Sequence, residues 1–490
     1  MKKSLTFQTV VIAFGKIVVS TSSLGSGMLL SRYLSLEDYG TYRQVLLIYN
    51  LLFPILTTGI SNSVNYYLPQ LAKEKQKTFL CQTYFILMVL GFAFSALLFW
   101  GADLISLYFN NPALKGCLQI FSLVPLLTMS TSFYQNYFIC LGKAFLSSFL
   151  SIGTALLRLG FILFSVFKLG TLTSIFQFLA IYSALEFGII TYFLYREAEG
   201  IKLDYKRWSF KKQLKFAFPI SLSSVVGTLT KQVDKIIISS SFSTSMYAVY
   251  ANGAVEIPLI HILTGSAMAV LMPEFVRLLQ QGEKKKLVAS WHNSINQLGL
   301  ILLPCMVFLY AFSNEAMSIL FSNKYLASVP VFRVYLFTLP MRVTIFGSVL
   351  LALGRPKSIL KYSLYTLVAN LFLSLLLVKK LGFLGPAWAT VAVIYLMDFF
   401  QLREIARQLG LGFRQVFPWL QQFKILVITL ISLPLPLGVA SLIQTDLIRF
   451  LTAGFTFLFC YGLAAFWLGL VSKKQLIQLA KQFVSGFRGK

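Results

Sequence analysis

Charged residues inside long apolar stretches are the positions of this 490-residue sequence that could do chemistry. A charge within a bilayer costs on the order of ~2.5–3.5 kcal/mol even on lenient insertion scales, so it is retained for a reason. Arg158 and Glu186 lie 28 residues apart, and Asn370 and Asp398 repeat that spacing. Consecutive antiparallel helices would hold both members of each pair at a similar depth. Two interpretations stay open: a polar staple across a helix hairpin, or an acid that exchanges protons during turnover.

A second group of charges lies on one predicted helix. Lys231 and Lys235 are four residues apart, so they share a helical face, and Asp234 could neutralise one of them. Lys231 is about 14 residues, or ~21 Å, from the predicted cytoplasmic end of its span, which is too deep for easy snorkelling. Arg342 lies in the middle of another span beside Pro340, which can kink a helix next to a cavity.

The balance of these charges favours an anionic ligand, because a cationic cavity attracts anions and both Lys and Arg match phosphate. The predicted spans contain six cationic residues (Lys16, Arg158, Lys231, Lys235, Arg333 and Arg342) and four acidic ones (Glu186, Asp234, Glu256 and Asp398). We expect a cationic substrate site formed by Lys231, Arg342, Lys235, Lys16 and Arg158. We expect ion coupling, if there is any, at Glu186, Asp398, Glu256 or Asp234.

Membrane-spanning helices must position these residues. The mean hydropathy is +0.75 and only 12% of residues are charged, which excludes an ordinary soluble domain. A span needs about 20 apolar residues. The sequence predicts fourteen spans, near 9–32, 44–67, 80–101, 118–140, 145–167, 173–194, 217–239, 246–271, 290–312, 328–352, 359–379, 384–402, 422–443 and 447–470.

The remaining basic residues are sorted by side. Of 43 Lys and Arg, 29 fall in one alternating set of loops and tails, including the 196–215 loop and the C-terminal tail, and 8 fall in the other set. The positive-inside rule then predicts a multi-pass protein of the inner (plasma) membrane with both termini cytoplasmic. A nucleic-acid partner is not expected, because the charge is dispersed among short loops.

An internal repeat sets the predicted architecture. Leu141-Gly142-Lys143 matches Leu353-Gly354-Arg355, and Lys168-Leu169-Gly170 matches Lys380-Leu381-Gly382, both at an offset of 212. Tyr39 and Tyr42 match Tyr247 and Tyr250 at an offset of 208. We predict an all-α protein of two parallel six-span repeats, 1–200 (an N-lobe) and 201–410 (a C-lobe), followed by two added spans and a cytoplasmic tail in 411–490.

Enzyme and metal chemistry are not indicated by the sequence. Its five cysteines lack metal or redox spacing and are expected to be free thiols, and two histidines are too few for a histidine-based metal site. We predict no catalytic residues, no cofactor and no metal. Two bundles facing each other are instead typical of an alternating-access carrier.

The residues also resemble a known family. The segment from Ser31 to Tyr42 looks like the short loop after the first span of Wzx-type polysaccharide flippases, and Asp234-Lys235-Ile236-Ile237-Ile238 looks like their span-seven segment. The plan of six, six and two spans is similar to that of the wider superfamily, which includes multidrug extrusion carriers and lipid II flippases.

The resemblance implies a carrier that moves undecaprenyl-diphosphate-linked oligosaccharide repeat units from the inner to the outer leaflet by alternating access. It also implies that the partners are the lipid-linked substrate and membrane lipids, with a polysaccharide polymerase and chain-length proteins as candidate protein partners. Two alternatives stay open: a multidrug-type or lipid II-type carrier of the same fold, and a membrane glycosyltransferase or polymerase. The short predicted loops argue against the enzymes, and the cationic bias argues against a carrier of cations.

Overall fold

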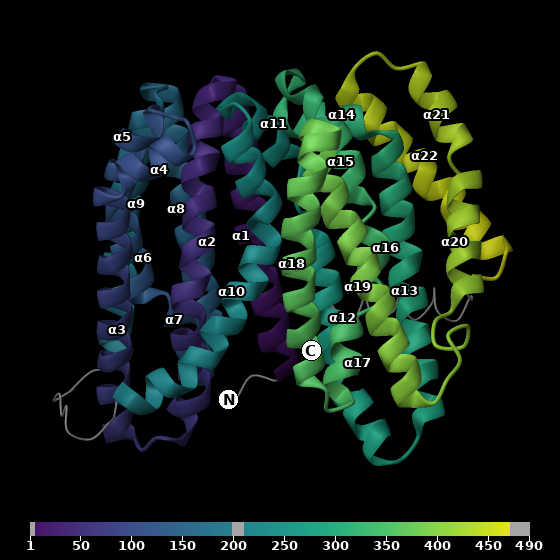
Figure 1. Ribbon diagram of the computed structural model, residues 1–490, viewed down its shortest axis with the longest axis horizontal. Helices are drawn as coiled ribbons and strands as arrows, with labels where there is room; N and C mark the ends of the chain where they lie inside the picture. Colours follow the sequence, from purple (N-terminus) through teal and green to yellow (C-terminus); the bar gives the residue numbers. More distant parts are fainter. Residues whose placement is uncertain (1–4, 198–209, 471–490) are drawn as a thin grey trace. The chain divides into compact units, whose positions relative to one another are not determined.

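The structure is a computed structural model that describes residues 5–197 and 210–470, and this described part is helical without a strand (Figure 1). Most of the predicted basic loop at 196–215 and most of the basic tail lie outside the described residues. An all-α membrane protein was predicted, and the described helices agree with that fold class.

Within the described residues 5–197, the first predicted repeat contains ten helical elements. These are α1 (Leu5–Tyr33), α2 (Leu36–Tyr67), η1 (Leu68–Gln70), α3 (Lys73–Trp100), α4 (Ala102–Tyr108), α5 (Ala113–Phe121), α6 (Leu123–Thr131), α7 (Tyr134–Cys140), α8 (Ala144–Lys168) and α9 (Leu172–Glu197).

The second predicted repeat and the C-terminal addition also consist of helices in the described residues. The second repeat consists of α10 (Phe210–Ser241), α11 (Thr244–Gly253), α12 (Pro258–Gln280), α13 (Lys284–Ala311), α14 (Ser313–Phe321), η3 (Asn323–Ser328), α15 (Val329–Leu336), α16 (Leu339–Arg342), α17 (Phe346–Ala352), α18 (Pro356–Leu381), η4 (Gly382–Leu384) and α19 (Gly385–Leu409). The addition consists of α20 (Trp419–Ile431), α21 (Pro434–Ser441) and α22 (Asp446–Trp467).

Eleven helical stretches of the described residues are long and apolar enough to cross a membrane. One of them, Pro356–Leu409, is 54 residues long and contains both α18 and α19. The predicted seventh and eighth spans correspond to α10 and to α11 with α12, which are not among the eleven. The membrane fold is therefore clear, while the count of fourteen spans stays a prediction.

The offset of 212 residues recurs in the bounds of the helices. Shifting α7 by 212 gives 346–352, the bounds of α17, and shifting α8 gives 356–380, within one residue of α18. The turns repeat too: Gly142 and Gly354 have φ of 73° and 69°, and Gly170 and Gly382 have φ of 64° and 58°. Only glycine adopts this left-handed conformation at little cost, so both copies keep it after the same helices.

One predicted boundary is wrong for a clear reason. The second span was predicted to start at 44, with Ser31–Tyr42 as a loop, but α2 starts at Leu36. Ser35 caps this helix by accepting a hydrogen bond from the Asp38 amide at 3.0 Å, and Glu37 and Asp38 supply acidic charge in the first turn. The second repeat starts α11 in the same way, with Ser243 accepting from the Met246 amide at 3.3 Å.

Proline interrupts two predicted spans, one in each predicted repeat. The predicted span 118–140 is divided into α5, α6 and α7, and the span 328–352 contains α15, α16 and α17. Pro125 cannot donate to the carbonyl of Phe121, where α5 ends, and Pro340 cannot donate to that of Leu336, where α15 ends. The helix break expected beside Arg342 is thus present in the structure.

The described residues pack as two compact units, one within 1–262 and 360–393 and the other within 263–359 and 394–490. In the first unit α2 packs against α10 and α11, α1 against α8, and α3 against α6, as Figure 1 lets the reader follow. In the second unit α13 packs against α20, and α21 against α22. The lobes predicted from the repeat, 1–200 and 201–410, describe copies in the sequence and stay a prediction. The two packing units have different boundaries from these lobes.

Candidate functional site

The first unit contains a cavity of about 630 Å³ between helices of the first repeat. Its lining consists of 28 residues, of which only 8 are apolar (Val19, Leu46, Phe53, Phe121, Val124, Ala155, Leu179 and Ile190). The other 20 residues carry hydroxyl, amide or charged groups, although the surrounding helices are apolar enough to span a membrane. Such a polar interior is costly in a membrane bundle and marks a functional site by default.

Helical spacing brings the polar residues onto single faces. On α2 the lining residues Tyr49, Phe53, Thr57 and Ser61 follow one another at intervals of four, which places them on one stripe. The same holds on the neighbouring helices, where the lining residues are three or four apart. They are Ser151, Thr154 and Arg158 on α8, and Leu179, Tyr182, Glu186 and Ile190 on α9.

Arg158 and Glu186 both line this cavity, so the structure brings the first predicted pair into one site. Both side chains are partly buried, and their charges interact without a direct ion pair to each other or to another described residue. The Tyr182 side chain also has a hydrogen-bonding interaction with the Glu186 carboxyl group. A guanidinium and a carboxylate that share a cavity in this way keep donor and acceptor capacity for a third group.

Several lining side chains are held by hydrogen bonds within the wall. The hydroxyls of Tyr49 and Thr128 are 2.9 Å apart, and those of Tyr134 and Ser151 are also 2.9 Å apart. Gln135 donates from Nε2 to the Ser151 hydroxyl at 3.0 Å. These bonds fix the tyrosine rings and preorganise the wall of the cavity.

Two lining hydroxyls are different, because they are buried and have no hydrogen-bond partner. They are the Oγ atoms of Ser61, on α2, and Ser132, between α6 and α7. Buried polar atoms are normally satisfied, so orphans on a cavity wall call for a ligand or water that completes them.

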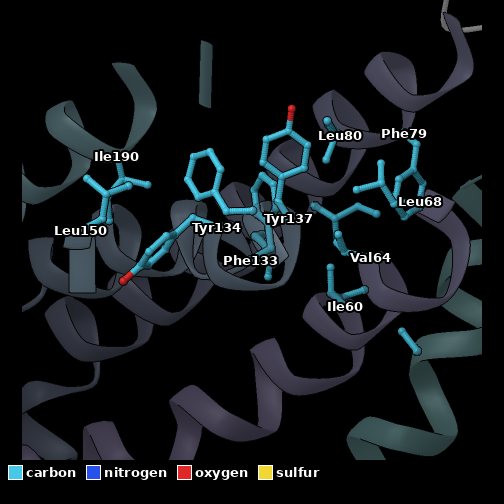
Figure 2. Close-up of a cluster of buried hydrophobic side chains, with 14 residues drawn as sticks. Ile60, Val64, Leu68, Phe79, Leu80, Phe133, Tyr134, Tyr137, Leu150 and Ile190 are labelled. Carbon is cyan, nitrogen blue, oxygen red and sulfur yellow. The ribbon is translucent and has the colours of Figure 1, made fainter. Parts of the chain in front are cut away.

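An apolar cluster supports the cavity from one side. Tyr134 and Ile190 belong both to the cavity lining and to a cluster of buried apolar side chains from α2, α3, α7, α8, α9 and α10. Figure 2 shows Tyr134 beside Leu150 and Ile190, with Ile60 and Val64 of α2 in the same cluster. Close packing behind Tyr134 keeps its ring from moving away from the cavity.

The predicted lysines do not line this cavity. Lys231 on α10 and Lys16 on α1 are exposed, and Lys235 is partly exposed and donates to the Lys231 carbonyl at 3.2 Å. Asp234 is 2% exposed and accepts a hydrogen bond from the Tyr250 hydroxyl at 3.2 Å, whereas Glu256 is exposed.

The second predicted pair differs from the first. Asn370 is buried on α18, where its amide lies 3.3 Å from the Thr390 hydroxyl and its carbonyl accepts from Ser374 at 2.9 Å. Asp398 falls in the other unit, where Gln401 lies at 3.2 Å and Arg342 interacts with its charge. Asn370 and Asp398 are thus divided between the units, and each has partners in its own unit.

Sequence reasoning missed most of the cavity lining, because it searched for charges. The available signal was the polar stripe of α2, in which Asn50, Thr57, Thr58, Ser61 and Asn62 fall within one predicted span. Arg43 was also missed, because it lies one residue before the predicted start at 44. It belongs to α2, and its guanidinium donates to the Ala251 carbonyl at 2.9 Å.

Two curated relatives match about half of the chain. The Staphylococcus aureus protein named "Capsular polysaccharide biosynthesis protein CapF" is 26% identical over 215 residues, which is 43% of this chain and 54% of that protein. An uncharacterized membrane protein of Methanocaldococcus jannaschii is 25% identical over 237 residues, 47% of this chain and 46% of the relative. The chain thus spans about half the length of these relatives.

Solved structures match over most of the chain and show the fold. The lipid II flippase MurJ superposes with a TM-score of 0.71 and 17% identity, covering 94% of this chain and 99% of that one. An inward-facing multidrug resistance transporter of the MATE family in the MOP superfamily gives 0.65 and 13% identity, covering 81% and 98%.

The family follows from a longer match. Residues 29–330, more than half of the chain, match the family described as "Polysaccharide biosynthesis protein". This match confirms the family resemblance seen in the sequence, and the two superpositions show a fold shared with these solved transporters. The chain belongs to the polysaccharide biosynthesis protein family, and it has the membrane fold of the lipid II flippase and the MATE transporters.

Proposed function

We propose that this protein flips undecaprenyl-diphosphate-linked oligosaccharide repeat units from the inner to the outer leaflet by alternating access. Membership of a polysaccharide biosynthesis family and a transporter fold support the proposal. The observation that carries it is the polar cavity inside an apolar bundle, because a hydrophilic head group needs such an environment to pass through the membrane.

The diphosphate is proposed to contact Lys231, with Lys235, Lys16 and Arg342 as further candidates. Lys231 is exposed in the middle of α10, a helix that corresponds to a predicted span. A lysine ammonium facing lipid at that depth would be costly, so a water-filled path is the more favourable environment. A diphosphate passing along that path would form charge-assisted hydrogen bonds with it.

Complementation of a flippase-null strain tests this function. Lys231→Ala should lose transport without losing protein from the membrane, whereas Lys231→Arg should keep substantial transport, because a lysine binds phosphate as a point charge that arginine also supplies. Membrane abundance is measured alongside. Lys285→Ala is the matched control, since Lys285 is an exposed lysine at the start of α13 outside the described cavity. Full transport by an abundant Lys231→Ala protein would exclude the diphosphate contact.

Two carriers of the same fold are the rival proposals: a lipid II-type flippase and a multidrug-type exporter. The family match favours a polysaccharide precursor over a drug. Transport assays with lipid II and with a lipid-linked oligosaccharide separate the first rival from the proposal. A membrane glycosyltransferase or polymerase is the rival of a different class, and it would form glycosidic bonds when purified with its substrates.

Ion coupling is proposed for one of four acids: Asp234, Glu186, Asp398 or Glu256. Asp234 is the best supported, because it is buried in α10, which corresponds to a predicted span, and is hydrogen-bonded to Tyr250. We further propose that the protein lies in the plasma membrane with both termini in the cytoplasm. Its proposed protein partners are a polysaccharide polymerase and chain-length proteins.

A further inference from the structure

We propose that the cavity of the first unit is a binding site for neutral sugar residues, rather than for the diphosphate of a lipid-linked substrate. The inference deepens the proposed function and rests on it for the identity of the substrate. Three independent features of the cavity lead to it: the chemistry of its lining, its balance of charge and its unsatisfied hydroxyls.

The lining offers hydrogen-bonding groups of the kind that sugar hydroxyls need. Serine, threonine and tyrosine hydroxyls and the Asn and Gln amides each donate and accept, and a sugar hydroxyl does both as well. Asn50, Asn62 and Asn136 line the cavity from two helices. A purely anionic ligand would leave the acceptor half of these groups unused.

The balance of charge in the cavity excludes a good match to a diphosphate. Among the lining residues that the structure describes, Arg158 is the one cation and Glu186 the one anion, so the formal charges cancel. A diphosphate carries several negative charges, and burying unpaired charge is strongly unfavourable. A guanidinium and a carboxylate that do not pair directly can instead share the hydroxyls of a neutral sugar ring between them.

The size of the cavity and its aromatic side chains fit a small saccharide. A volume of 630 Å³ lies within the range of about 300–1,000 Å³ found for small-molecule sites. Tyr49 and Phe53 have ring centroids 5.1 Å apart and both line the cavity. Aromatic rings cover the apolar face of a sugar, while the unsatisfied Ser61 and Ser132 hydroxyls would bind its edge.

Binding is measured on the purified full chain by calorimetry. The probes are five neutral sugars (glucose, galactose, mannose, N-acetylglucosamine and chitobiose) and two anions (pyrophosphate and glucuronate). At least one neutral sugar should bind. Arg158→Gln and Glu186→Gln should each weaken that binding about tenfold, since hydrogen bonds to charged groups are roughly twice as strong as neutral ones.

Matched controls come from an ion pair of the same unit outside the cavity. Lys115 and Asp103 are 2.7 Å apart on α5 and α4, so Lys115→Gln and Asp103→Asn remove the same charges elsewhere. Neither should change sugar binding. Equal weakening by these variants would overturn the proposal, because the effect would then be one of general charge or folding.

Chemical protection locates the bound sugar. In a cysteine-free background, Ser23→Cys places a thiol on the cavity lining and Ser441→Cys places one on an exposed end of α21. The sugar that binds should slow alkylation at position 23 at least threefold and leave position 441 unchanged. If no neutral sugar binds to the wild-type protein, or if the anions alone protect position 23, the proposal is wrong.

The two proposals fail in different ways. A chain that rescues the flippase-null strain but binds none of the neutral sugars keeps its function and loses the sugar site. A chain that binds a neutral sugar but restores no transport keeps the site and loses the flippase proposal.

Discussion

The helix α2 carries two sets of polar residues, and they serve different purposes. One set, with Tyr49, Thr57 and Ser61, lines the cavity. The other set packs against α10 and α11 along a seam that we define by Tyr39, Arg43, Gln44 and Ser63 of α2 with their partners. Both sides carry hydrogen-bonding groups within a membrane bundle, so polarity alone does not distinguish function from structure.

Partners distinguish them. On the seam Tyr39 donates to the Asn252 side chain at 2.9 Å and Gln44 to the Ser239 hydroxyl at 3.0 Å, with all four residues buried. Ser63 accepts from the Gln213 amide at 2.9 Å. The cavity side instead keeps the unpartnered Ser61 hydroxyl. Most polar groups of the seam therefore hold the fold, although the Asn252 Nδ2 atom has no partner there, whereas the unpartnered Ser61 hydroxyl faces a cavity that can admit a ligand.

The seam also joins equivalent parts of the two repeats. An offset of 208 relates Tyr39 to Tyr247 and Arg43 to Ala251, and Arg43 contacts both of the residues of the second repeat. The Arg43 guanidinium donates to the Ala251 carbonyl at 2.9 Å, and the Tyr247 hydroxyl donates to the Arg43 carbonyl at 3.3 Å. Equivalent residues that meet in this way fix the register of α2 against α11.

The largest expected loss of folding stability comes from a substitution at Gly40, where α2 and α11 approach each other closely. A Cβ atom at Gly40 would lie 2.2 Å from the Thr244 carbonyl oxygen, which belongs to backbone and cannot rotate away. Gly40→Ala should destabilise the protein by about 1–3 kcal/mol, as overpacking does elsewhere. Thermal unfolding of the purified protein measures it.

The control for this change is a glycine in open surroundings. A Cβ atom at Gly160 on α8 would meet nothing within 4 Å, so Gly160→Ala should be neutral or stabilising by up to about 1 kcal/mol. Similar melting temperatures for the two variants would show that the backbone near Thr244 can shift to accommodate a Cβ atom at Gly40. That result would contradict the description of the seam as tightly packed.

A smaller effect is expected from two serines of α2 that are two residues apart. Ser63→Ala removes the acceptor for Gln213 on the seam and should cost about 1 kcal/mol of folding stability. Ser61→Ala removes a hydroxyl without a partner, so folding stability should stay the same or rise slightly, while sugar binding falls. A stability loss at Ser61 as large as that at Ser63 would contradict the distinction.

The sequence predicted the repeat well, because helix ends and glycine turns leave local signals. Gly142 and Gly354 mark the same turn in both copies, and α7 and α17 have equivalent bounds. The start of α2 was missed because its first turn is polar, so a search for apolar spans passes over it although Ser35 and Asp38 form a recognisable cap.

The cavity could be predicted only in part. Arg158 and Glu186 were expected near each other from their spacing, and both line it. The hydroxyl and amide residues could not be assigned, since a polar stripe on α2 reads alike whether it meets a partner helix or an open cavity. That choice depends on packing between helices distant in sequence, such as α2 with α10, which one sequence does not reveal.

The smallest expected effect tests whether Arg158 and Glu186 are a structural staple. They do not form a direct ion pair in the structure, although both belong to the cavity. A double-mutant cycle of Arg158→Gln and Glu186→Gln should give a coupling in folding stability below about 0.5 kcal/mol, because no direct ion pair joins the two side chains. Thermal unfolding of the four proteins measures the coupling, and Arg449 with Glu315, an ion pair at 3.4 Å, is the positive control. A coupling of 1 kcal/mol or more would show that the pair is a structural staple. The two charged residues of the cavity would then hold the fold, as the polar residues of the seam do, and only the neutral residues would be left to bind a sugar.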